Sequence, residues 1–194
     1  MLITPFRIVL IICFAIIAVG LILWQFNVTW PSIAAGIFIL ALVILAIIDL
    51  HIQLLPDKLT QPLIWGGLLV NLKGTFVPLE DAVLGAVFGY LALWLLARVY
   101  LLWRQQEGIG YGDFKLAAAL GAWLGYKILF TETLILALIA SGSAGLLMLI
   151  IFLHKKKYRL SEQRQSFARL LQTPIPFGPF LAAAGIWSIL FSVH

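Results

Sequence analysis

The chain has 194 residues, of which 63% are hydrophobic and only 11% are charged, and its mean hydropathy is +1.08. A soluble domain carries about 25% charged residues, so this composition excludes an ordinary soluble protein and predicts an all-α, polytopic membrane protein. The net charge of +5 follows the membrane topology described below, so we expect no nucleic-acid binding. The single cysteine, Cys13, excludes a disulfide framework and a CxxC metal site.

Seven apolar segments approach the length of about 20 residues that a membrane-spanning helix needs. The first is too long for the apolar core of a signal peptide, so we read it as a retained helix. The only long polar stretch, residues 154–172, is expected to be a loop or surface helix. Residues 1–194 are therefore expected to form one membrane-embedded domain. The seven predicted spans are residues 8–25, 31–49, 59–77, 81–103, 114–129, 131–153 and 175–193.

The basic residues predict the orientation of these spans. With a cytoplasmic N-terminus and seven alternating helices, every lysine and arginine except Lys73 and Lys127 lies on or near the cytoplasmic side. The basic segment 154–172 is then a cytoplasmic loop. The same topology places the end of the second span and the start of the fifth span on one side of the bilayer.

A short motif occurs twice, as LGAVFGY at residues 84–90 and as LGAWLGY at residues 120–126. Each copy contains a Gly-x-x-x-Gly pair, which allows helix backbones to approach closely in lipid. We interpret both as helix-packing motifs in preference to a sliding or hinge element. Just before the first copy, Asp81 is predicted to be the N-cap of the fourth span.

Two aspartates lie at the cytoplasmic ends of predicted spans, where ionisable residues are functional candidates. Asp49 ends the second span, and Asp113 follows the sequence GIGYG and opens the fifth. Two aspartates at close range share a proton, so that one can act as a base on water while the other acts as an acid toward a carbonyl. This is the arrangement of an aspartyl protease, and no Ser/His or Cys/His set competes with it.

Other interpretations of these acids remain open on the sequence alone. Asp113 could simply cap a helix after an ordinary flexible loop. A metal site formed by Asp49, His51 and Asp57 is disfavoured because no His/Cys cluster supports it. The glycines at positions 108, 110 and 112 would permit positive φ angles and, lacking Cβ atoms, would let an extended substrate approach.

Four stretches in order along the chain resemble the type IV prepilin peptidases. They are DLHIQLLPDKLTQPLIW, EDAVLGAVFGYLALWLL, GIGYGDFKLAAALGAWLG and TPIPFGPFLAAAG, and the resemblance runs from about Ile48 to Ile186. It implies a GxGD-type intramembrane aspartyl peptidase in which Asp49 and Asp113 are the catalytic pair. Asp57 is expected to cap or orient the loop before the third span. The motif residues expected to contact substrate are Glu107, Gly110, Tyr111, Gly112 and Lys115.

The resemblance also implies the substrate and the location. The substrate would be a prepilin or pseudopilin with a short basic leader, a glycine before the cut and an apolar helix after it. Cleavage would occur at the cytoplasmic face of the bacterial inner membrane, without metal or cofactor. Many family members carry an N-terminal domain with two CxxC pairs that is associated with N-methylation. With one cysteine, this sequence is expected to provide the peptidase alone, without methyltransferase activity. The oligomeric state is not predicted.

Three alternatives are kept. A GxGD protease could act on other membrane proteins, with the same chemistry but without leader specificity. A transporter or scaffold could use the acids to bind ions or protons, but few polar residues fall at mid-span. An inactive homologue would retain both motif aspartates without activity.

Overall fold

The structure is a computed structural model that describes residues 20, 29–104, 110–143, 146 and 177–192. Within these ranges every regular element is helical and no strand occurs, which confirms the all-α prediction. The predicted first span, apart from residue 20, and the polar segment 154–172 lie outside the described residues. The same is true of Glu107 and of most of the sixth predicted span beyond residue 143.

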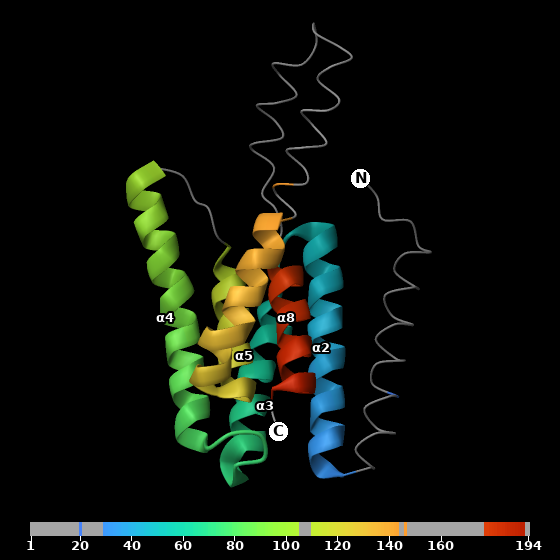
Figure 1. Cartoon of the computed structure of the whole chain (residues 1–194). Helices are drawn as coiled ribbons and strands as arrows, with labels where there is room; N and C mark the ends of the chain where they lie inside the picture. The colour runs from blue at the N-terminus through green and yellow to red at the C-terminus, as the bar shows by residue number, and fades with distance from the viewer. Residues whose placement is uncertain (1–19, 21–28, 105–109, 144–145, 147–176, 193–194) are drawn as a thin grey trace, which may run out of the picture.

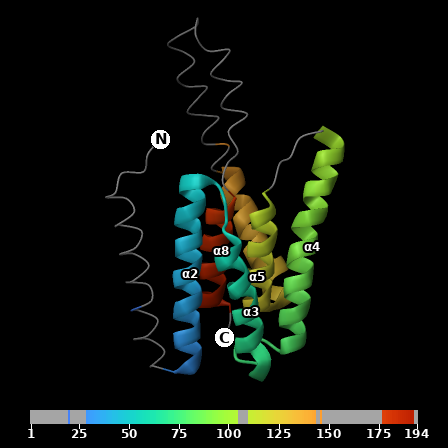
Figure 2. The same cartoon turned by 180° about the vertical axis from the view of Figure 1, so that it is seen from behind.

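The described helices form a bundle in which α2, α3, α4 and α5 run in alternating directions (Figure 1 and Figure 2). In Figure 1, α2 and α4 rise, whereas α3, α5 and α8 descend. The upper end in that view therefore holds the end of α2 and the starts of α3, α5 and α8. The elements are α2 (Trp30–Ile52), α3 (Asp57–Val70), a 3₁₀ turn (Asn71–Lys73), α4 (Leu79–Arg104), α5 (Tyr111–Ile128), a π turn (Leu129–Thr133) and α8 (Gly178–Phe191).

Three segments of the described chain have the length and apolar composition of a membrane span: Trp30–Ile52, Leu79–Trp103 and Tyr111–Ser143. The last of these is interrupted at Gly125 and is not one straight helix. At 1.5 Å per residue, α2 is about 35 Å long and exceeds the roughly 30 Å of a hydrocarbon core. The chain is thus a helical protein with several candidate spans. The count of seven spans stays a prediction.

Two predicted spans were too long. The third was predicted at 59–77, but α3 ends at Val70, and α8 has 14 residues within the predicted 175–193. Each of these helices is about 21 Å long, which is shorter than the hydrocarbon core. Scattered apolar residues follow both helix ends (Leu72, Phe76 and Val77 after α3, Val193 after α8), so hydropathy alone misplaced the ends.

The side chain of Asn71 explains why α3 stops. It is fully buried, and its amide donates hydrogen bonds to the carbonyls of Ala122 (2.9 Å) and Trp123 (3.2 Å). The side-chain oxygen of Asn71, Oδ1, accepts hydrogen bonds from the backbone N–H groups of Phe76 and Val77. Backbone groups of a tight turn must find partners when water is absent, and Asn71 supplies them. The α3–α4 connection is therefore anchored to the far end of α5.

Helix α5 is the centre of the bundle and packs against α3, α4 and α8. It is buried almost continuously from Asp113 to Gly125, and small residues dominate that stretch. A helix that is apolar on all sides is suited to such a position. Trp123 stacks on Phe38 of α2 with ring centroids 4.5 Å apart, and its indole N–H donates to the carbonyl of Leu63 in α3 (2.9 Å).

The two copies of the repeated motif pack against each other, which confirms their interpretation as packing motifs. A Cβ atom on Gly85 would collide with the carbonyl oxygen of Gly121, and one on Gly121 would collide with Gly85. A Cβ on Gly89 would lie 2.6 Å from the carbonyl oxygen of Ala117. Residue numbers rise along α4 as they fall along α5, so this contact is antiparallel.

Gly125 separates the fifth and sixth predicted spans. Its φ of 75° and ψ of 166° are not helical, and a residue with a Cβ would be strained there. In Figure 1 the yellow segment descends and the orange segment that follows it rises, so the chain reverses direction within this region. The reversal was predicted at about residue 130, so it begins a few residues earlier than expected.

The prediction that Asp81 is an N-cap was wrong. Helix α4 begins at Leu79, and Asp81 lies inside its first turn, where its carboxylate pairs with Lys127 at 3.3 Å. An acid in the first turn still complements the helix dipole. Elsewhere α4 exposes many large apolar side chains, including Leu95, Val99 and Leu102, as expected for a surface that faces lipid.

Candidate active site

Asp49 lies in the last turn of α2, and its side chain is only 5% exposed. The helix ends four residues later at Gln53, which adopts a left-handed conformation (φ 53°, ψ 36°) and donates its backbone N–H to the Asp49 carbonyl at 2.9 Å. This sharp stop turns the chain into the loop of residues 53–56. Asp49 is therefore held at the end of a long helix, just where the chain folds back toward α3.

Asp113 lies in the first turn of α5 and is 9% exposed. The helix begins at Tyr111 with Gly110 as its N-cap, so Asp113 is not itself the N-cap considered in the sequence analysis. The Asp113 N–H donates to the Gly110 carbonyl at 3.1 Å, and its carboxylate lies against the Gly110 backbone N–H. An acid at the third helical position is typical of a capping box, and here it fixes the carboxylate at the helix start.

The structure brings Asp49 and Asp113 together although 64 positions separate them in sequence. The charge of Asp49 acts directly on the Asp113 carboxyl group, and both side chains are buried. Two like charges in a buried site repel strongly, so such a pair retains one proton between its members. The arrangement is therefore suited to hold one acid and one base side by side.

The start of α8 completes this cluster. The backbone N–H of Gly178 is directed at the Asp49 carboxylate, and a Cβ atom at Gly178 would lie 2.6 Å from Asp49 Oδ2. Asp49 Oδ2 is also the one buried side-chain nitrogen or oxygen in the described ranges without a hydrogen-bond partner from the protein. An unsatisfied buried oxygen costs free energy, and it marks a place where a water or a substrate group would find a partner.

Leu55 fills the space between the two glycine-containing segments. It is 8% exposed, whereas its neighbour Leu54 is 68% exposed, so the loop directs one leucine inward and the other outward. A Cβ on Gly112 would lie 2.7 Å from Leu55 Cβ, and one on Gly178 would lie 3.4 Å from Leu55 Cδ1. The loop of residues 53–56 is thus part of the wall around the two aspartates.

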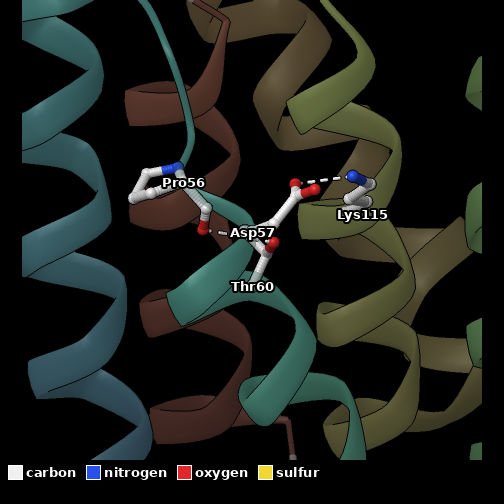
Figure 3. Close-up of polar contacts among 4 residues, drawn as sticks. All are labelled: Pro56, Asp57, Thr60 and Lys115. Atoms are coloured by element: carbon white, nitrogen blue, oxygen red, sulfur yellow. Dashed lines mark hydrogen bonds and ion pairs between the residues drawn. The ribbon is translucent and has the colours of Figure 1, made fainter.

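An ion pair connects this loop to α5 (Figure 3). Lys115 Nζ lies 2.5 Å from Asp57 Oδ1, and the side chains are 26% and 57% exposed, respectively. The prediction that Asp57 caps α3 was wrong, because Pro56 is the N-cap and no side-chain cap bond forms. Thr60 Oγ1 instead donates to the Pro56 carbonyl at 3.4 Å.

Gly110 and Gly112 do not use positive φ angles, and Gly108 lies outside the described residues. Gly110 is extended (φ −71°, ψ 144°) and Gly112 lies within the helix; among the described glycines only Gly74 and Gly125 have positive φ. The second expected reason, close approach, holds at Gly112, where Leu55 is the neighbour. Tyr111 is 65% exposed with its ring against Phe114, so it is accessible from outside the bundle.

The metal alternative gains no support from this geometry. In the part of the chain that the structure covers, no three His, Cys, Asp or Glu side chains are grouped to hold an ion. Asp57, one of the three residues considered, is engaged with Lys115.

Sequence reasoning missed two residues at the site, Leu55 and Gly178. Both lie in motifs that resemble the family, Leu55 in LLPD and Gly178 in TPIPFGP. The sequence did not predict that either residue lies beside the two aspartates. The usable signal was the helix start: Pro179 is favourable in the first turn of α8, so the helix begins at the preceding glycine and presents a free backbone N–H there.

Comparisons with known proteins found matches over most of the chain. Residues 36–153 match the family model described as "Type IV leader peptidase family". The chain is 46% identical over 162 residues to a protein of Aeromonas salmonicida (strain A449), covering 84% of this chain and 50% of that protein. It is 44% identical over 174 residues to a protein of Dickeya chrysanthemi, with 89% and 54% covered.

A protein of Pseudomonas aeruginosa is 42% identical over 172 residues, with the same coverage of 89% and 54%. All three relatives are named "Prepilin leader peptidase/N-methyltransferase". The chain spans about half the length of these curated relatives. No solved structure matched it.

Proposed function

Since the chain belongs to the type IV leader peptidase family, we propose that it is a membrane aspartyl endopeptidase that removes the short basic leader of prepilins or pseudopilins. The observation that carries this proposal is the pairing of Asp49 with Asp113. Two buried carboxylates from different helices lie within electrostatic reach of each other. Relatives with 42–46% identity are named prepilin leader peptidases, which supports the same substrate class.

The proposed reaction needs only these two side chains and water. The ionised aspartate takes a proton from water, and the resulting oxygen forms a bond to the scissile carbonyl carbon. The protonated aspartate gives its proton to the carbonyl oxygen. In the collapse of the tetrahedral intermediate the C–N bond breaks, and the aspartate that took the water proton gives it to the leaving amine. The other aspartate takes a hydroxyl proton back as the carbonyl re-forms. The products are the free leader and the mature N-terminus.

The surroundings of the pair support this chemistry. The N-termini of α5 and α8 both point at the carboxylates, through Gly110 and Gly178, and helix N-termini stabilise negative charge. Asp49 Oδ2 has an unused hydrogen-bonding position that a water could occupy. Tyr111, Gly110 and Gly112 border the approach, and we assign them, with Glu107, to substrate contact.

The proposed site lies at the cytoplasmic face of the bacterial inner membrane. Asp49 and Asp113 both sit at helix ends on one side of the bundle, where a basic leader would remain in water while the apolar helix of the substrate stays in lipid. The excess of lysine and arginine predicted on that side supports the orientation. The proposed peptidase reaction does not itself require methylation.

The test is cleavage of a purified prepilin, with a basic leader and a glycine at the cut, by the full chain in detergent. We expect cleavage after the glycine, and a rate lower by roughly 10²–10⁴-fold in Asp49→Asn and in Asp113→Asn, as for loss of an acid–base group. Asp81→Asn is the matched control, because that acid also pairs across α5 but lies at the opposite end.

The product is read by mass spectrometry, which reports both the cut position and any added methyl group. An apolar single-span protein without a basic leader is the comparison substrate, and equal cleavage of it would favour a general GxGD protease. Full activity in Asp113→Asn would refute the aspartyl mechanism. If the folded wild type does not cleave the prepilin, the result favours a transporter, a scaffold or an inactive homologue.

A further inference from the structure

The ion pair between Asp57 and Lys115 has no part in the proposed chemistry, yet it lies close to the aspartates in sequence and in space. Lys115 follows Asp113 by two positions on α5, and Asp57 follows Leu55 by two positions at the start of α3. The two groups are 2.5 Å apart, and Figure 3 shows the lysine reaching from α5 to the first turn of α3.

The loop before Asp57 depends on a fixed distance to α5. Leu55 is buried against Gly112 and Gly178, and these glycines adjoin the two segments that hold Asp113 and Asp49. If the loop moved outward, Leu55 would leave this position and the backbone around both carboxylates would lose a packing partner. The ion pair is the described charged contact that ties the start of α3 to the start of α5.

Helix dipoles show that the pair is not there to stabilise the helices individually. Asp57 is favourable in the first turn of α3. Lys115 is the fifth residue of α5, just beyond its first turn, so its positive charge gains nothing from the helix dipole. A lysine in that place needs a reason beyond helix stability, and its contact with Asp57 supplies one.

We propose that Asp57 and Lys115 are positioning residues, whose ion pair holds loop 53–56 against α5 so that Leu55 stays wedged between Gly112 and Gly178 beside the two aspartates. This inference rests on the proposed peptidase function. It changes the expected role of Lys115 from substrate contact to positioning. It also assigns Asp57 the orienting role without the capping role.

A partly exposed ion pair contributes little to the free energy of unfolding. The expected effect of breaking it is therefore on turnover rather than on folding. Displacement of reacting groups by about 1 Å can lower a rate by up to 10²-fold. We expect each charge reversal, Asp57→Lys or Lys115→Asp, to lower kcat by roughly tenfold while KM changes by less than about twofold.

The decisive variant carries both reversals. If the pair acts by holding the loop, Asp57→Lys combined with Lys115→Asp should restore kcat to within about threefold of wild type, because coupled residues are non-additive. Lys115→Arg should keep most of the activity, since it preserves the charge. The matched control is Asp81→Lys, which breaks the ion pair at the other end of α5 and should leave kcat unchanged.

Three results would overturn the inference. A double reversal no faster than the slower single variant would show that pairing is not the cause. A loss confined to KM would show that Asp57 or Lys115 contacts the substrate leader. Activity in Lys115→Arg as low as in Lys115→Asp would exclude a role for the charge.

A second measurement separates this inference from the proposed function. Hydrogen–deuterium exchange of the peptide covering residues 53–57 should be faster in Lys115→Asp and return toward wild type in the double reversal, whether or not a prepilin is cleaved. Unchanged exchange would refute the positioning role even if the enzyme is active. Absence of cleavage by wild type, with the exchange pattern as expected, would refute only the peptidase proposal.

Discussion

The contact between Gly178 and Asp49 leads to a prediction about a single methyl group. In Gly178→Ala the new Cβ would lie 2.6 Å from Asp49 Oδ2 and 3.0 Å from its Cγ, so the carboxylate must move. We expect prepilin cleavage to fall by roughly 10–100-fold, with a stability loss of about 1 kcal/mol. Turnover and thermal unfolding of the same purified sample measure the two effects.

The control for this variant is Gly66→Ala on α3. The added methyl there would lie 3.7 Å from Trp123 Cζ2, which is an ordinary packing distance, so activity should be unchanged. Equal turnover in Gly178→Ala and wild type would mean that the Asp49 carboxylate does not need its observed position.

At the residue level the sequence was informative about the acids and uninformative about what surrounds them. Asp49 and Asp113 were expected at one end of the bundle because they flank apolar spans, and the structure brings them within electrostatic reach. Gly178 reaches Asp49 only through the fold, from 129 positions along the chain, and Leu55 lines the site through its contacts with Gly112 and Gly178. The pairing of Lys115 with Asp57 spans 58 positions and left no local pattern to detect.

At the level of elements, α4 and α5 approach each other more closely at Gly85 and Gly121 than any other described glycine approaches a neighbouring backbone. Gly121→Ala would insert a Cβ into the Gly85 peptide unit, and the helices would have to separate. Overpacking of this kind costs about 1–3 kcal/mol. Unfolding followed by circular dichroism in mixed micelles with increasing dodecyl sulfate should show this loss of stability.

Gly142→Ala provides the comparison for that experiment, because no atom lies within 4 Å of the added methyl position. Its stability should remain within about 0.5 kcal/mol of wild type. If the two alanine variants unfold at the same detergent fraction, the glycine contact is not a stabilising feature of the bundle.

Helix existence could be predicted from hydropathy, but helix ends could not. Spans predicted at 31–49 and 81–103 correspond to α2 and α4 with small shifts. The third span was predicted seven residues too long, because its end is set by Asn71 bonding to Ala122 and Trp123, far along the chain. The chain also reverses at Gly125 because of the φ angle of that residue. A glycine within an apolar run does not by itself predict such a reversal.

For the whole molecule, the testable quantity is the orientation in the membrane. In a Cys13→Ser background, Leu54→Cys and Lys73→Cys place single thiols at exposed positions at opposite ends of α3. A membrane-impermeant maleimide should label Lys73→Cys in intact cells and should label Leu54→Cys only after permeabilisation. The reverse pattern would place Asp49 and Asp113 on the outer face and contradict the proposed access of a basic leader.

The antiparallel contact between the two glycine motifs also bears on assembly. The two similar heptapeptides meet in opposite directions, so each presents nearly the same surface to the other. The contact thus resembles the interface of a two-fold symmetric dimer, although both helices belong to one chain. Copies inserted in a bilayer share one orientation, so α4 of one copy is parallel to α4 of another and cannot reproduce the contact. Detergent removes that constraint. In a bilayer, therefore, the contact can form between two molecules only when α4 of one packs against α5 of the other. In a micelle an α4–α4 contact is also allowed.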